Sequence, residues 1–180
     1  MRGLLVGRFQ PFHGGHLEVV RSIRQARPGS PLVIAIGSAD VSYTAENPFT
    51  AGERVEMIDR ALRAASVDGV MVVPVADIHR HALWVRYLEG LLPKFDRVYT
   101  NNPLTRLLFE QAGYAVESPP LVDRARYEGV RIRAAIADDS DWSSSVPPAV
   151  AEYLREIGAV ARLRMLRSAP PAGRGGAAPP

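Results

Sequence analysis

Short apolar runs alternate with helical patterns along most of the chain. Runs rich in β-branched residues predict buried strands at Gly3–Val6, Leu32–Ile36, Val70–Val75 and Arg97–Tyr99, with a weaker pattern at Tyr114–Val116. Between these runs, apolar residues recur three and four positions apart, which is the spacing of one face of a helix. Because strands alternate with amphipathic helices, we expect right-handed crossovers and a Rossmann-like α/β fold with a doubly wound parallel sheet.

Local signals place several helix boundaries. Thr50 fits an N-cap, and Glu53 three residues later completes a capping box ahead of a helix over Arg54–Ala65. The pair at 119–120, both proline, interrupts the pattern and predicts a loop to about Tyr127. Two further helical patterns follow this loop: Val130–Ala137 and Pro148–Glu156.

The pattern indicates one domain followed by a tail. Residues 1–167 carry every predicted element, and their length fits one α/β domain with a sizeable core. Residues 168–180 are Pro, Gly and Ala apart from Ser168 and Arg174. Such a segment has no large apolar side chain to bury, so we expect a disordered tail.

Composition narrows the class of protein. The chain has no cysteine, which excludes disulfides and thiolate metal sites and makes a cytoplasmic protein the simplest expectation. No apolar stretch approaches a membrane span, and the run at Leu4–Val6 is too short for a signal peptide. The net charge of +3 is mild and the basic residues are spread along the chain. We therefore expect neither a nucleic-acid partner nor a membrane partner.

Candidate chemistry lies where the first strand meets the first helix, in residues 7–16. Ligands of open parallel sheets bind at the carboxyl ends of strands, and free N–H groups at a helix N-terminus attract anions. Gly7 permits a tight turn there. His13 and His16 are three residues apart, so both rings can face one side and donate hydrogen bonds to phosphate oxygens. The alternative is that each histidine only caps the helix or fills a polar gap.

This turn carries a signature that extends the interpretation. The pattern Gly-x-x-x-Pro-x-His-x-Gly-His at residues 7–16 resembles that of the HxGH nucleotidyltransferase superfamily. Within it, five segments are similar to the archaeal-type nicotinamide-nucleotide adenylyltransferase family: residues 1–37, 48–54, 82–85, 95–99 and 138–142. The resemblance covers about residues 1–165. It implies that the 5′-phosphate of nicotinamide mononucleotide attacks the α-phosphorus of ATP, giving NAD and pyrophosphate without a covalent enzyme intermediate.

The resemblance also implies the donor site. His13 and His16 would hold the triphosphate, and Arg133, on the arginine of the superfamily's second signature, would clamp the β- and γ-phosphates; these three are the expected catalytic residues. The full expected ATP-binding set is Gly7, Arg8, Phe9, His13, His16, Gly129, Arg131 and Arg133. Mg²⁺ would enter with ATP, and no protein metal ligand is expected because the sequence shows no dedicated carboxylate cage.

For the acceptor, the family resemblance implies contacts from Asp77, Trp84, Asn102 and Arg124. The Trp84 indole would stack on the cationic pyridinium ring, an interaction worth ~0.5–2 kcal/mol. Asp77 or nearby backbone would read the carboxamide. Without the resemblance, a core position on an amphipathic helix would be the better interpretation of Trp84. The resemblance further implies a homo-oligomer, for example a hexamer.

Three positions depart from the family pattern. Glu46 stands where relatives often carry an arginine, and Glu128 and Val130 stand where the second signature often has hydroxyl residues. These departures keep a related transferase with another acceptor or nucleotide donor as an alternative function. A non-catalytic nucleotide sensor is a second alternative, which intact His13, His16 and Arg133 disfavour.

Overall fold

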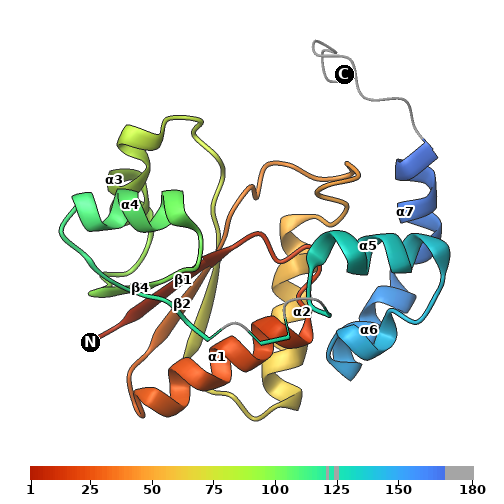
Figure 1. Ribbon diagram of the computed structural model, residues 1–180, viewed down its shortest axis with the longest axis horizontal. Coiled ribbons are helices and arrows are strands. Elements are labelled where there is room, and N and C mark those ends of the chain that lie inside the picture. The colour runs from red at the N-terminus through yellow and green to blue at the C-terminus, as the bar shows by residue number, and fades with distance from the viewer. Residues whose placement is uncertain (121, 124–125, 169–180) are drawn as a thin grey trace.

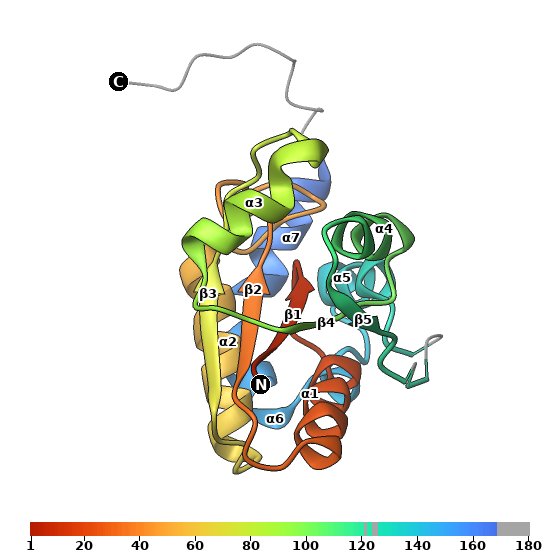
Figure 2. The ribbon, with the colours of Figure 1, turned by 90° about the vertical axis from the view of Figure 1, so that its left-hand side faces the viewer.

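The computed structural model describes residues 1–120, 122–123 and 126–168 (Figure 1). Within them, one sheet contains five strands in the order β3-β2-β1-β4-β5, and every neighbouring pair is parallel. The strands are β1 (Gly3–Gly7), β2 (Leu32–Ile36), β3 (Val70–Pro74), β4 (Arg97–Tyr99) and β5 (Ala115–Glu117). Each lies within one or two residues of its predicted position, and the predicted fold class is confirmed. Figure 2 shows the strands side by side from β3 to β5.

Helices connect the strands and complete the described chain. They are α1 (Gly14–Ala26), α2 (Ala51–Ala64), α3 (His81–Leu91), α4 (Pro103–Gln111), α5 (Gly129–Asp138), α6 (Pro148–Glu156) and α7 (Ala159–Ser168), with a 3₁₀ turn at Ser143–Ser145. The predicted capping box is present, because the Thr50 hydroxyl accepts from the Glu53 N–H and the Glu53 carboxylate accepts from the Thr50 N–H.

Two hydrophobic clusters cover the two faces of the sheet. Alternate side chains of β2 enter different clusters, Ile34 one and Val33 the other, as the two-residue period of a strand requires. The larger cluster packs β1 and β2 against α1, α2, α5, α6 and α7, whereas the smaller one packs them against α3 and α4. Figure 1 shows α3 and α4 apart from this larger group of helices.

Two expectations differ from the structure. β3 is not fully buried: it is the edge strand next to β2, and Met71 is 49% exposed. A β-branched run cannot tell an edge strand from a central one, because strand order is set by tertiary packing. The sequence patterns also missed α7, whose last residue is Ser168. Of the predicted tail, residues 169–180 lie outside the described residues.

The strand order fixes where a ligand can bind. The chain moves outward from β1 through β2 to β3, then crosses to the other side of β1 to form β4 and β5. In sheets of this kind, ligands bind at the carboxyl ends of the strands where the order reverses, here between β1 and β4. None of the described helices is long and apolar enough to cross a membrane.

Candidate active site

The turn after β1 starts α1 with a reciprocal histidine cap. His13 is the N-cap residue, and its Nδ1 accepts a hydrogen bond from the backbone N–H of His16 at 3.2 Å. The His16 Nδ1 in turn accepts from the His13 N–H at 3.3 Å. Both histidines therefore cap the helix, which was the alternative role for them, but the cap uses only their Nδ1 atoms. Both Nε2 atoms stay available for a ligand.

Stacked aromatic rings hold the two imidazoles in place. Their centroids lie 3.4 Å apart, with Tyr127 stacked on His13 at 5.7 Å and Phe12 on His16 at 5.5 Å. A Cβ at Gly14 would come within 2.8 Å of the Tyr127 ring, and one at the next residue, also glycine, within 3.0 Å. The glycines between the histidines thus make room for this column of rings.

Burial keeps both histidines neutral. Loss of solvent lowers the pKa of His13 from 6.5 to about 4. Burial, together with the nearby His13, lowers the pKa of His16 well below 6.5. A neutral imidazole whose Nδ1 accepts a hydrogen bond carries its proton on Nε2. Each ring therefore presents an Nε2–H donor that the cap holds in a fixed direction.

A cavity of about 200 Å³ lies beside these rings and collects positive charge. Arg8 and Arg133 both line it, and the Arg133 Nη1 donates to the carbonyl of Gln10 at 2.9 Å. Burial lowers the pKa of Arg133 and the nearby Arg8 lowers it further, whereas Glu46 raises it. Two guanidinium groups that repel each other are stabilised when an anion binds between them. The cavity is therefore suited to phosphate.

The structure brings together most of the predicted ATP-binding residues. Six of the eight line this one cavity: Arg8, Phe9, His13, His16, Gly129 and Arg133. Gly7 lies under the Phe9 ring, where a Cβ would come within 2.8 Å, and does not line the cavity. Arg131 does not line it either; its exposed guanidinium pairs with the Glu128 carboxylate at 2.9 Å. The ATP-binding roles of these residues stay predictions.

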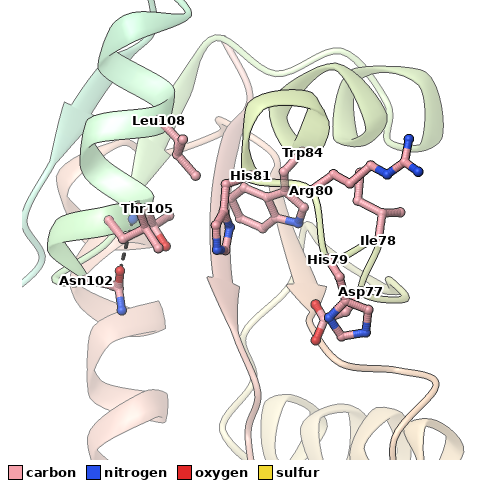
Figure 3. Close-up of a pocket in the computed structure, with 10 residues that line it drawn as sticks. Asp77, Ile78, His79, Arg80, His81, Trp84, Asn102, Thr105 and Leu108 are labelled. Carbon is pink, nitrogen blue, oxygen red and sulfur yellow. Dashed lines mark hydrogen bonds between the residues drawn. The ribbon is translucent and has the colours of Figure 1, made fainter.

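A second cavity, of about 250 Å³, lies between the N-terminal ends of α3 and α4 (Figure 3). Asp77, Trp84 and Asn102, three of the four predicted acceptor residues, all line it. The fourth, Arg124, lies outside the described residues. Trp84 also packs edge-on against Phe109 with centroids 5.6 Å apart, so it serves the core and the cavity wall together.

Local hydrogen bonds orient the polar groups of this second cavity. The Ser38 hydroxyl donates to the Asp77 Oδ2 at 2.6 Å. The Asn102 Oδ1 caps α4 by accepting from the Thr105 N–H at 2.9 Å, as Figure 3 marks, so its amide nitrogen is the group left for a ligand. His81 lines the cavity beside Trp84, and the sequence reasoning missed it. Only its position three residues before that tryptophan could have indicated it.

Glu46 lies in a neighbouring cavity of about 310 Å³ that shares Arg133 with the phosphate-suited one. The negative charge of its carboxylate raises the pKa of the Arg133 guanidinium. Val130 lines the same cavity and is 63% exposed. Two of the three departures from the family pattern therefore meet at the outer side of Arg133.

The residues that the structure describes offer no resident metal site. In the part of the chain that the structure describes, no group of three or more His, Asp or Glu side chains could hold a metal ion. The residues around the 200 Å³ cavity include two arginines, which repel a free cation, and two histidines whose Nδ1 atoms already accept the cap hydrogen bonds. A divalent metal would have to arrive already bound to phosphate.

The parallel sheet and its His-x-Gly-His turn define the class of protein, a nucleotidyltransferase. In agreement, the family model described as cytidylyltransferase-like matches residues 4–145. A solved structure, the bifunctional NMN adenylyltransferase/ADP ribose pyrophosphatase from Francisella tularensis, superposes with a TM-score of 0.76 at 18% identity. The match covers 92% of this chain and 52% of that one, so this chain spans about half of that protein. A likeness at this identity is one of fold.

Closer relatives identify the family. The nicotinamide-nucleotide adenylyltransferase of Thermoplasma volcanium is 47% identical over 165 residues, which is 92% of either chain. That of Archaeoglobus fulgidus is 47% identical over 169 residues, 91% of this chain and 96% of its own. This chain therefore belongs to the nicotinamide-nucleotide adenylyltransferase family, as its sequence motifs predict.

Proposed function

We propose that the protein transfers the adenylyl group of ATP to nicotinamide mononucleotide, giving NAD and pyrophosphate. The observation that carries the proposal is a pair of cavities at the carboxyl ends of the strands. One gathers two arginines and two Nε2–H donors, which suits a triphosphate. The other offers an indole face, a carboxylate and an amide, which suits a pyridinium carboxamide.

In this reaction an oxygen of the acceptor's 5′-phosphate bonds to the α-phosphorus, and the bond from that phosphorus to the bridging oxygen of pyrophosphate breaks. The electron pair leaves with pyrophosphate, so no protein nucleophile is needed. His13 and His16 donate through Nε2–H to phosphate oxygens as charge moves toward the leaving group. Arg133 and Arg8 stabilise the charge on that group. Fixed donors of this kind need no reorganisation during the reaction, which is why they lower its barrier.

On the acceptor side, Trp84 stacks on the pyridinium ring, and Asp77 and the Asn102 amide nitrogen hydrogen-bond the carboxamide. Figure 3 shows these side chains lining one space from two helices and a loop. Arg124 is proposed to contact the acceptor phosphate. Mg²⁺ is proposed to enter as the counter-ion of ATP, where it neutralises phosphate charge. A solved relative in complex with AMP and an Mn ion supports the use of a divalent metal.

Assembly and location complete the proposal. We expect residues 1–167 to act as one catalytic domain and the chain to form a homo-oligomer, which sedimentation velocity would measure. A cytoplasmic location stays a prediction from the cysteine-free composition.

Product analysis tests the proposed reaction. The protein is incubated with Mg²⁺, ATP and nicotinamide mononucleotide, and the products are identified by mass and counted. We expect NAD and pyrophosphate in equal amounts. Parallel reactions replace ATP by CTP, GTP or UTP, and the acceptor by its deamidated form. If wild-type protein leaves nicotinamide mononucleotide unchanged but consumes another acceptor or donor, the alternative transferase function replaces this one.

A further inference from the structure

A buried arginine joins the two turns that lead to the two cavities. Arg54 lies in the first turn of α2 and has no exposed surface. Its Nη1 donates to the carbonyl oxygens of Arg8 at 3.0 Å and Gly37 at 2.8 Å. Its Nη2 donates to the Ser38 carbonyl at 3.0 Å, and its Nε to the Thr50 carbonyl at 3.2 Å. One guanidinium therefore binds the turns after β1 and β2 to the start of α2.

Burying the charge of Arg54 among these partners is unfavourable if the residue serves only to stabilise the fold. All four hydrogen bonds go to neutral backbone carbonyls rather than to a carboxylate. Burial lowers the pKa of Arg54, and the nearby Arg8 lowers it further, while Asp40 and Asp77 raise it. Buried charges of this kind are often no better for stability than a well-packed apolar residue. A role in the geometry of the site accounts for the residue better than a role in the core.

Three of the four carbonyls that Arg54 binds belong to turns that contain a residue of positive φ. Phe9 has a φ of 52° and Ser38 a φ of 50°, both in the left-handed region that disfavours residues other than glycine. Arg54 holds the carbonyl just before Phe9 and the carbonyl of Ser38 itself. Such strain persists only where surrounding contacts over-determine the conformation. The guanidinium supplies those contacts for both turns at once.

Each strained turn leads to one cavity. Arg8 lines the phosphate-suited cavity, and the same turn continues into the histidine cap. On the other side, the Ser38 hydroxyl holds the carboxylate of Asp77, which lines the cavity beside Trp84. Arg54 lines neither cavity.

From this arrangement we propose that Arg54 is a positioning residue that sets the two substrate sites relative to each other. It does so by holding the turns after β1 and β2 in their left-handed conformations. The inference rests on the proposed function, and it adds a residue that touches neither substrate.

The main test compares Arg54→Lys with Leu154→Ala. Lysine keeps the charge but has three N–H donors on a single nitrogen, so it cannot make all four carbonyl hydrogen bonds of Arg54. Leu154 is fully buried in α6, so its truncation destabilises the fold while all four hydrogen bonds of Arg54 keep their partners. Both variants are assayed at a temperature where circular dichroism shows them folded. We expect Arg54→Lys to lower kcat by ~10-fold or more, because misplacement of about 1 Å can cost 10²-fold. Leu154→Ala should stay within about twofold of wild type.

Ligand affinity separates this inference from the proposed function. If wild-type protein makes no NAD, the proposed function fails, yet calorimetry with Mg²⁺-ATP still compares the same two variants. Weaker ATP binding in Arg54→Lys than in Leu154→Ala supports the positioning role. Equal behaviour of the two folded variants in both kcat and ATP affinity overturns it.

A second variant covers the case in which Arg54→Lys does not fold. Ser38→Ala keeps the Ser38 carbonyl that Arg54 binds and removes only the hydroxyl that holds Asp77. We expect the KM for nicotinamide mononucleotide to rise roughly 10-fold, which is the loss of one charge-assisted hydrogen bond, while the KM for ATP stays within twofold. An unchanged acceptor KM would show that the turn after β2 does not position the acceptor site.

Discussion

The histidine pair makes the stability of the fold depend on pH in one direction. Burial holds the pKa of His13 at about 4, against 6.5 for an exposed histidine. When pH falls from 7 to 5, the unfolded chain takes up a proton at this residue and the folded chain does not. Protons therefore favour unfolding, and the two pKa values give a loss of about 2 kcal/mol in the free energy of unfolding. His16 adds to the loss in the same direction.

Urea unfolding measures this loss when wild type is compared with His13→Asn. Asparagine keeps a side-chain acceptor for the helix N-cap but cannot titrate. Tryptophan fluorescence from Trp84 and Trp142 follows unfolding at pH 7 and at pH 5. We expect wild type to lose about 2 kcal/mol more than the variant over this interval. The stability that depends on a neutral His13 in the fold is fully present above pH 6.5 and is lost as pH falls toward 4.

Equal losses in the two proteins would show that His13 is already protonated in the fold at pH 5. In that case its Nδ1 could not accept from the His16 N–H, and the assignment of a neutral Nε2–H donor would fail.

Three further predictions concern catalysis, the acceptor and the C-terminal segment. His16→Ala should lower kcat by ~10²-fold while circular dichroism shows an intact fold, as for loss of one preorganised donor; near-normal turnover would remove this turn from the active site. Trp84→Ala should raise the Kd for nicotinamide mononucleotide roughly 10-fold by calorimetry and leave the Kd for ATP nearly unchanged; equal weakening of both would make Trp84 a core residue only. Deleting residues 169–180 should leave the melting temperature and kcat unchanged, since no large apolar side chain is lost; a clearly lower melting temperature would show that the segment docks on the fold.

Local patterns predicted most of the fold because they depend on near neighbours in the chain. The strand β2 and the helix α6 have their predicted bounds, and the cap of α2 formed by Thr50 and Glu53 is present. Two residues three apart are enough for a capping box, so sequence shows it directly. The turn with His13 and His16 could be predicted for the same reason, because these two residues are also three apart.

What sequence could not predict depends on contacts between distant segments. Arg54 looks like one charge among many on an amphipathic helix, yet it is fully buried because carbonyls 16, 17 and 46 residues away turn toward it. The helix α7 was missed because arginines mask its pattern. One of them, Arg162, pairs with Glu53 at 2.7 Å across 109 residues, a contact no local window contains.

The three departures from the family pattern lie around the cationic cavity rather than within it. Glu128 pairs with Arg131 at the start of α5, and the exposed pair does not line the cavity. Glu46 and Val130 lie on the outer side of Arg133, in the neighbouring cavity. The histidine donors and the Arg133 contact with the Gln10 carbonyl are intact. In the proposed reaction, Glu46 opposes negative charge on a triphosphate bound at Arg133 and on the pyrophosphate that leaves. We therefore expect Glu46 to raise the KM for ATP and also to lower kcat, because charge on the leaving group grows in the transition state. The proposed chemical step depends on the histidine donors and Arg133, which this chain retains.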